Sequence, residues 1–152
     1  MVNNMVLSIE RNGSGWNESV AGRSVVYDLA DAALHASATA DRLRAVESLG
    51  RTDDPRAVRP LMDLLEDTDP AIRLAATTEL GRLKSGRPVD DLIGRLRDRG
   101  EQDATRRQAI VSLAAIRSTG ALRGLKEFAA DEDEDSGLRA SARDALKDIG
   151  IW

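Results

Sequence analysis

The stretch DPAIRLAATTELGRL, residues 69–83, has the pattern of one amphipathic helix with a capping residue in front of it. Asp69 can accept a hydrogen bond from a backbone N–H of the first turn. Pro70 has the backbone angle of a first helical residue and lacks the N–H that would go unpaired there. Similar stretches recur in the 152-residue chain, namely ADRLRAVESLGR, DATRRQAIVSLAAIR and GLRASARDALKDIG. The repetition of one helix therefore decides the fold.

The four copies share a leucine, an alanine four residues before it and an arginine seven residues before it. Offsets of four and seven residues fall on one face of an α-helix. The leucines are Leu49, Leu80, Leu113 and Leu146, the alanines are Ala45, Ala76, Ala109 and Ala142, and the arginines are Arg42, Arg73, Arg106 and Arg139. We call these helices A helices. The leucines are 31, 33 and 33 residues apart, which indicates a repeat array.

A second helix, the B helix, fits between consecutive A helices. Its apolar positions recur as Val58, Leu61 and Leu65, then Val89, Leu92 and Leu96, then Leu122, Leu125 and Ala129. Asp54 and Pro55 predict a capped start of the first B helix, and Pro60 predicts a short turn at 55–58 before its main part. Gly86, Gly100 and Gly150 are predicted to end helices.

Residues 54–83, DPRAVRPLMDLLEDTDPAIRLAATTELGRL, resemble a HEAT-like repeat of the phycobilisome-lyase type. The resemblance rests on the D-P-R-A-V opening, the acidic exit of the B helix, the I-R at the start of the A helix and the L-G near its end. It extends over roughly residues 22–150 and is weaker in the third helix pair, where Ala114 replaces Gly. It implies an all-α fold, a right-handed α-solenoid of about eight helices in which each repeat contacts mainly its neighbours.

We expect two regions. Residues 1–21 are polar apart from an MVLSI patch, and we expect an N-terminal extension that is flexible or caps the first helix. A repeat domain is expected over residues 22–152. Its parts are expected to be a B helix at 25–37, repeats at 39–67, 69–99 and 103–130, and a terminal A helix at 136–150.

Composition narrows the class of protein. Charged residues make up 32% and aromatic residues 3% of the chain, which favours helices with Ala and Leu cores. There is no run of eighteen apolar residues and no basic start typical of a secretory signal, so we expect a cytoplasmic protein with no membrane span. Nineteen of the 22 basic residues are Arg and seventeen of the 26 acidic residues are Asp. This bias resembles proteins of salt-loving archaea, and we expect an archaeal source.

We expect no enzyme activity, no cofactor and no metal. Deoxyhypusine hydroxylase, a HEAT-like enzyme, needs several His-Glu pairs for its di-iron site, whereas His35 is the one histidine of this chain and cysteine is absent. No P-loop, G-x-G-x-x-G or G-x-S-x-G motif is present. The likeness to phycobilisome lyases lies in scaffold residues, and no chromophore-handling residue is identified.

The charges on the B helices alternate in sign, which disfavours nucleic acid as a partner because phosphate binding requires a stripe of one sign. We therefore predict a non-catalytic scaffold or adaptor for protein–protein interaction, whose partner is another protein. The alternative is an accessory subunit or lyase-like helper that acts on a cofactor-bearing protein. The candidate partner-binding residues are Arg59, Asp63, Asp90, Arg97, Arg123, Glu127 and Trp152.

The arginines of the A helices, Arg42, Arg73, Arg106 and Arg139, form what we call the arginine ladder. They share the apolar stripe, where an unpaired charge is costly. We interpret them as structural, paired with acidic residues of nearby turns, such as Asp69 with Arg73 and Asp135 with Arg139. The alternative is a basic row that holds phosphate. Trp152 follows the last A helix, and we expect it to fold over the core or to contact another chain, such as a second copy in a homodimer.

Overall fold

The computed structural model describes residues 16–152, with side chains from residue 25 onward. The described residues form eight α-helices and two short 3-10 segments, with no strand. The helices are α1 Trp16–His35, α2 Thr39–Arg51, α3 Val58–Asp63, α4 Pro70–Leu83, α5 Val89–Arg97, α6 Asp103–Ile116, α7 Thr119–Ala130 and α8 Ser136–Asp148, and the 3-10 segments are η1 Pro55–Ala57 and η2 Leu64–Glu66. The prediction of an all-α fold is confirmed. The part of the expected extension at 1–15 lies outside the described residues.

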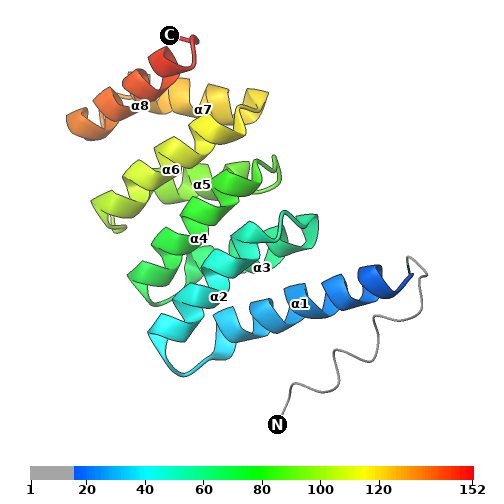
Figure 1. Ribbon diagram of the computed structural model, residues 1–152. Helices are drawn as coiled ribbons and strands as arrows, with labels where there is room; N and C mark the ends of the chain where they lie inside the picture. Colours follow the sequence, from blue (N-terminus) through cyan, green and yellow to red (C-terminus); the bar gives the residue numbers. More distant parts are fainter. Residues whose placement is uncertain (1–15) are drawn as a thin grey trace.

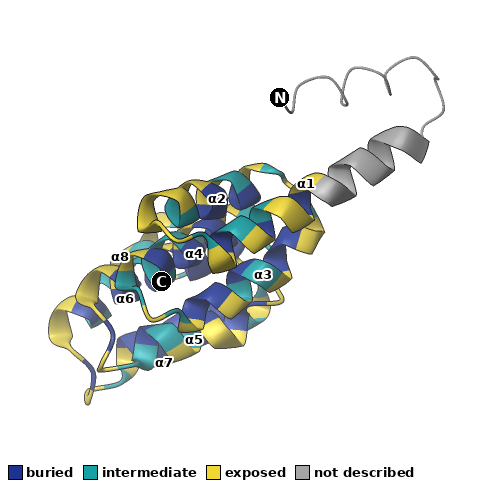
Figure 2. Cartoon of the chain, turned by 90° about the horizontal axis from the view of Figure 1, so that it is seen from below, coloured by how far each residue is buried: buried dark blue, intermediate teal, exposed yellow. Residues whose placement is uncertain are grey.

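The helices are stacked in two layers (Figure 1). The A helices α2, α4, α6 and α8 follow one another in one layer, and the B helices α3, α5 and α7 follow one another in the other. Contacts join neighbours in the array: α4 packs against α2 and α6, and α5 packs against α6 and α7. Seen along the stack, the buried residues lie between the two layers (Figure 2). This arrangement is an α-solenoid, in which no single helix pair has a complete core of its own.

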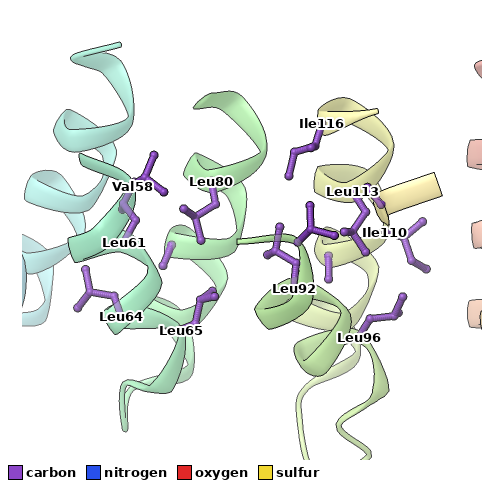
Figure 3. Close-up of a cluster of buried hydrophobic side chains, with 14 of the residues drawn as sticks. Val58, Leu61, Leu64, Leu65, Leu80, Leu92, Leu96, Ile110, Leu113 and Ile116 are labelled. Carbon is purple, nitrogen blue, oxygen red and sulfur yellow. The ribbon is translucent and has the colours of Figure 1, made fainter. Parts of the chain in front are cut away.

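The core is the predicted apolar stripe. The leucine of every A helix is fully buried, and the alanine four residues before it is at most 5% exposed. Leu61 of α3 and Leu92 of α5 are fully buried opposite them. Figure 3 shows side chains of α3, α4, α5 and α6 gathered between the layers. Burial of these side chains is the main favourable contribution to folding, at roughly 1.5–3 kcal/mol for each large aliphatic side chain.

Local signals place several helix ends. The side chain of Asp69 accepts a hydrogen bond from Ala71 N at 2.9 Å, and that of Asp54 accepts one from Arg56 N at 2.9 Å, as expected for N-caps before proline. The first B helix is divided into η1, α3 and η2, and Pro60 lies in the first turn of α3, directly after the predicted short turn. These features follow from residues close together in the sequence, and their prediction is confirmed.

Two helix ends differ from the prediction. The first helix begins at Trp16 and not near residue 25, because the polar segment 16–24 contains no proline and polarity alone does not end a helix. The left-handed residue after α4 is Lys84, with φ of 50°, and not Gly86. Gly150 has φ of 76°, the left-handed conformation in which glycine is favoured. None of the helices in the described range is long and apolar enough to cross a bilayer.

Candidate interaction surfaces

The first three arginines of the ladder bind acidic residues in the turn that follows the next B helix. The pairs are Arg42 with Asp67, Arg73 with Glu101, and Arg106 with Glu134. Each pair therefore connects an A helix to the turn that ends its own repeat and leads into the next A helix. Arg106 Nη2 lies 2.8 Å from Glu134 Oε2, and both side chains are less than a tenth exposed. A guanidinium paired with a carboxylate in this setting keeps two charges hydrogen-bonded inside the stack.

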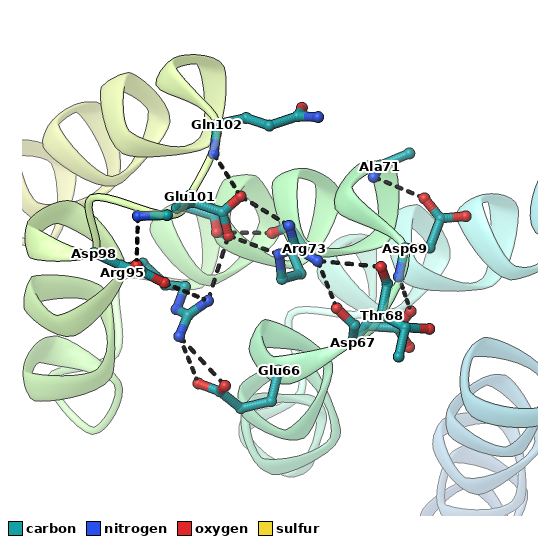
Figure 4. A network of polar contacts seen from close by, with 12 residues as sticks. Glu66, Asp67, Thr68, Asp69, Ala71, Arg73, Arg95, Asp98, Glu101 and Gln102 are labelled. Atoms are coloured by element: carbon teal, nitrogen blue, oxygen red, sulfur yellow. Dashed lines mark hydrogen bonds and ion pairs between the residues drawn. The ribbon is translucent and has the colours of Figure 1, made fainter.

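Arg73 is the centre of the most extensive network (Figure 4). Its Nε and Nη2 donate to the two carboxylate oxygens of Glu101 at 2.6 and 2.9 Å, and its Nη1 donates to the carbonyl of Asp67 at 2.7 Å. Arg95 joins the same carboxylate at 3.3 Å and reaches Glu66 at 3.0 Å. The hydrogen bonds from Arg73 lower the pKa of the Glu101 carboxyl, which is buried but stays charged. The network therefore connects the turn before α4 with the next turn of the same kind, before α6.

The predicted acidic partners of the ladder were wrong. Asp69 and Asp135 cap the A helices: Asp69 accepts from Ala71 N, and Asp135 accepts from Leu138 N at 2.8 Å. A carboxylate bound to the first-turn amides is not directed at the arginine one turn later. That arginine extends instead toward the neighbouring repeat. The missed residues are Asp67, Arg95, Glu101 and Glu134. The missed signal was an acidic residue 25 or 28 positions after each of the first three arginines.

The fourth arginine, Arg139, has different surroundings. Its Nε is buried and has no hydrogen-bond partner among the described residues. In the preceding repeat Arg106 Nε donates to the carbonyl of Leu96 at 2.7 Å. The corresponding carbonyl, 33 residues later, is that of Ala129, and it accepts from Arg143 Nη1 at 3.0 Å. Arg143 thus occupies the acceptor that corresponds to that of Arg106.

The B-helix face is the exposed side of α3, α5 and α7, and its predicted residues on α3 and α7 lie in local ion pairs. Arg59 Nε and Asp63 Oδ1 are 3.1 Å apart, and Arg123 Nε and Glu127 Oε1 are 3.9 Å apart. The arginine side chains are 71% and 74% exposed. The two residues of each pair are one turn apart on the same helix, and neither pair contacts another repeat. Because exposed pairs contribute little stability, their charges are available to a partner.

The remaining predicted residues are not gathered into one site. Arg97 pairs with Asp131 at 2.9 Å and its guanidinium carbon lies 5.8 Å from the centre of the Phe128 ring. The hydrogen bond from Arg97 lowers the pKa of the Asp131 carboxyl. Asp90 is exposed at the start of α5. Trp152 is 53% exposed, beyond the end of α8.

The described residues include no cluster of side chains suited to a metal ion. In the part of the chain that the structure describes, no group of three or more His, Cys, Asp or Glu residues could hold a metal ion. His35 lies at the end of α1, where its Nδ1 is 3.0 Å from Asp31 Oδ1, and both side chains are exposed.

Comparison with known proteins matches the fold. The chain matches the HEAT repeats family over residues 28–104 and 75–147, which together cover most of its length. Human deoxyhypusine hydroxylase, solved with glycerol, is similar with a TM-score of 0.71 and 26% identity, over 80% of this chain and 42% of the hydroxylase chain. The complex of CpcE and CpcF of phycocyanin lyase from Nostoc sp. PCC7120 contains a similar chain, with a TM-score of 0.61 and 22% identity, over 93% of this chain and 95% of that one. None of the curated proteins matches in sequence.

These comparisons correct one expectation. We expected no enzyme activity because the sequence contains no catalytic motif, yet the similar structures are a hydroxylase and a lyase, so that expectation is not supported. An absent motif says little about activity here, because one fold can carry many unrelated sites. This chain spans less than half the length of the hydroxylase chain. The stacked helix pairs, the buried leucine stripe and the match over most of the sequence show that the chain belongs to the HEAT repeat family.

Proposed function

We propose that this HEAT-repeat protein binds another protein along its B-helix face, as a scaffold or adaptor. The observation that carries the proposal is the contrast between two sets of charges. The ladder arginines Arg42, Arg73 and Arg106 bind acidic residues between repeats, in partly or fully buried pairs. The charges on α3 and α7 have only local, exposed partners. Charges of the second kind can exchange their partners on binding without loss of the fold.

The B-helix face has the chemistry of a protein-binding surface and not of a phosphate groove. Its pairs on α3 and α7 each combine one positive and one negative charge, over two successive turns of the same helix. A partner with the complementary order of charges would align along the stack, whereas a polyanion would be repelled by Asp63 and Glu127. Rows of equivalent residues on successive repeats give HEAT-repeat proteins an extended surface of this kind.

A second candidate is a lyase-like helper that acts together with a cofactor-bearing protein. Its support is the fold-level similarity to a chain of the phycocyanin lyase complex, which extends over 93% of this chain. Fold similarity by itself does not transfer an activity. The absorption spectrum of a complex purified from the native host separates the two candidates, because a bound pigment or cofactor favours the helper.

The proposal is tested by affinity capture from the native host, with the captured proteins identified by mass spectrometry. Reversal of Arg59 and Arg123 to Glu should leave helicity and melting temperature nearly unchanged, because both side chains are exposed, and should reduce capture of the partner. The matched control reverses Arg44 and Arg107, which are exposed on the A helices α2 and α6. If the control reversal abolishes capture and the B-helix reversal does not, the assignment of the B-helix face is wrong.

A further inference from the structure

Each A helix presents one row of residues to the next A helix in the stack. A Cβ atom placed on Gly50 of α2 would meet the Glu79 side chain of α4, and one on Gly81 of α4 would meet Ser112 of α6. Ser112 Oγ also donates a hydrogen bond to the carbonyl of Thr77 at 2.8 Å. The positions one residue after and three residues before the repeat leucine therefore lie at the contact between A helices. We call these two positions the stacking positions.

The stacking positions of α8 differ in chemistry from those of the other A helices. In α2, α4 and α6 they are uncharged and buried: Val46 and Gly50, Thr77 and Gly81, Ile110 and Ala114. In α8 they are Arg143 and Lys147, and the Lys147 side chain is 56% exposed. A further A helix packed here in the same way would bury two cationic side chains, which is costly without acidic partners.

The B-helix layer shows the same change. Ile93 of α5 packs over Gly124 of α7, where an added Cβ would lie 2.4 Å from the Ile93 side chain. The residue 33 positions after Ile93 is Lys126 of α7, and it is exposed. The outer end, which we define as Lys126, Arg139, Arg143 and Lys147, thus collects four positive charges in a chain whose net charge is -4. One of them, Lys147, has an exposed neighbour in Asp144 at 3.6 Å.

Arg139 gives this basic end a specific anchor. The three equivalent arginines each hold a carboxylate, whereas Arg139 Nε is buried with no partner in the described residues, and the carbonyl equivalent to the acceptor of Arg106 is bound by Arg143. We propose that the outer end of α7 and α8 binds an acidic segment of a partner protein, one of whose carboxylates pairs with the guanidinium of Arg139. The inference rests on the proposed function as a protein-binding scaffold and adds a second contact, distinct from the B-helix face.

The chemistry of the site favours a carboxylate-bearing protein over two other occupants. A second copy joined through the same face would oppose like charges at Arg143 and Lys147, which disfavours a symmetric dimer through this end. A nucleic acid requires a continuous row of cations along its phosphates, and Asp144 beside Lys147 interrupts such a row, whereas a single carboxylate needs only one cationic contact. The ladder arginines that do have partners bind Asp or Glu in every case, so a carboxylate is the group that fits the repeat geometry.

The test measures fluorescence anisotropy of a labelled oligoglutamate peptide with the full-length protein at low salt. Wild type should bind saturably, and Arg139→Ala should raise the dissociation constant about tenfold through loss of a charged hydrogen bond. Lys147→Glu, a change at an exposed position that does not threaten folding, should weaken binding at least as much. Arg59→Ala, an exposed arginine of the B-helix face, should change the constant by less than about twofold.

Three results would overturn the inference: no saturable binding by wild type, equal weakening by Arg59→Ala, or tighter binding of a single-stranded DNA oligonucleotide of equal charge. Should Arg139→Ala fail to fold, Lys147→Glu alone tests whether the outer end binds the peptide, and unchanged binding by this variant would contradict the inference. Failure of the proposed function is distinguished by affinity capture from the native host. A partner captured equally by wild type and Lys147→Glu leaves the scaffold function intact and removes the outer end from it.

Discussion

Arg73 Nε lies 2.6 Å from Glu101 Oε2, although the two residues are 28 positions apart in the sequence. Arg73 lies in α4 and Glu101 lies in the turn between α5 and α6, so their two parallel hydrogen bonds form only when the α4–α5 pair has folded and brought this turn beside α4. The Glu101 side chain is fully buried and that of Arg73 is 17% exposed. The pair therefore links helix packing to the burial of two charges. If Arg73 is removed, the buried Glu101 carboxylate is left unpaired, which lowers the stability of the fold.

The first prediction concerns this pair. Arg73→Ala should lower the free energy of unfolding by about 3 kcal/mol, because it leaves the buried Glu101 carboxylate without its main partner. The double variant Arg73→Ala/Glu101→Ala should cost less than the sum of the single changes, since residues in contact are not additive. Urea unfolding followed by circular dichroism measures all three values.

Arg139→Ala is the matched control, because Arg139 has the same position in its repeat but no partner for its Nε in the described residues. We expect a loss of less than about 1 kcal/mol for this variant. Equal losses for Arg73→Ala and Arg139→Ala would mean that packing of the arginine stem, and not the ion pair, is what stabilises the stack.

The second prediction is an acid-sensitive stack. Hydrogen bonds from Arg73 lower the pKa of Glu101 below its ordinary value of 4.5. Burial acts to raise the pKa of Asp67, but hydrogen bonds from Arg42 and from the Asp69 amide outweigh it and lower the pKa. A lowered folded-state pKa contributes stability above the unfolded pKa and loses it as pH falls through the folded value. The free energy of unfolding should therefore decrease as pH falls below about 4.5, the ordinary pKa of Glu, and through the lowered values. Glu101→Gln should flatten that decrease, and an unchanged slope would contradict the assignment.

The third prediction compares two glycines within helices. A Cβ on Gly81 would lie 2.6 Å from Ser112 Cβ and 2.7 Å from its Cα, so Gly81→Ala requires a backbone shift between α4 and α6. We expect a loss of about 2 kcal/mol. Gly94 of α5 has no atom within 4 Å of such a Cβ, and Gly94→Ala should increase stability by about 0.5–1 kcal/mol. Melting temperatures that move in the same direction for both variants would argue against the close approach at Gly81.

The features that could be predicted from the sequence are those set by neighbouring residues. The apolar stripe, the Asp69 cap and the short turn before Pro60 all depend on residues within a few turns of one another. The partners of the ladder could not be inferred in this way. Asp69 is the nearest acid to Arg73, but it binds amides of its own helix, and the guanidinium reaches Glu101 only because the solenoid places the next turn beside it.

The outer end illustrates the same limit. Arg143 and Lys147 are visible in the alignment of the four copies, but an exposed helix face normally has such residues. Their significance depends on the contact of Gly81 with Ser112, which shows that the equivalent positions face the next helix. The class of activity is harder still to infer from the sequence. A motif search detects only local patterns, and the similarity to the hydroxylase and lyase structures is a similarity of fold, which does not determine activity.

The last prediction concerns Glu79, an acidic residue of α4 that is only 6% exposed and packs beside Gly50 of α2. Its Oε2 is buried and accepts no hydrogen bond of good geometry in the described part of the chain, although it forms an ion pair with Arg82. Burial raises the pKa of this carboxyl, and the nearby charges of Arg82 and Arg51 only partly oppose the change. A carboxyl whose pKa is higher in the folded than in the unfolded protein contributes stability at pH values below its unfolded-state pKa. That contribution is lost as the pH rises through its folded-state pKa.

Glu79→Gln should therefore increase the free energy of unfolding at neutral pH by about 1 kcal/mol, because an uncharged amide replaces a desolvated carboxylate. Near pH 4 the gain should disappear, since the wild-type carboxyl is then largely protonated in the folded state. Glu127→Gln, a change on the exposed face of α7, is the control and should be nearly neutral at both pH values. Arg82 Nε lies 3.2 Å from Glu79 Oε2. If Glu79→Gln is less stable than wild type at neutral pH, attraction to Arg82 outweighs the cost of burial, and Glu79 holds α4 against α2 as a charged residue.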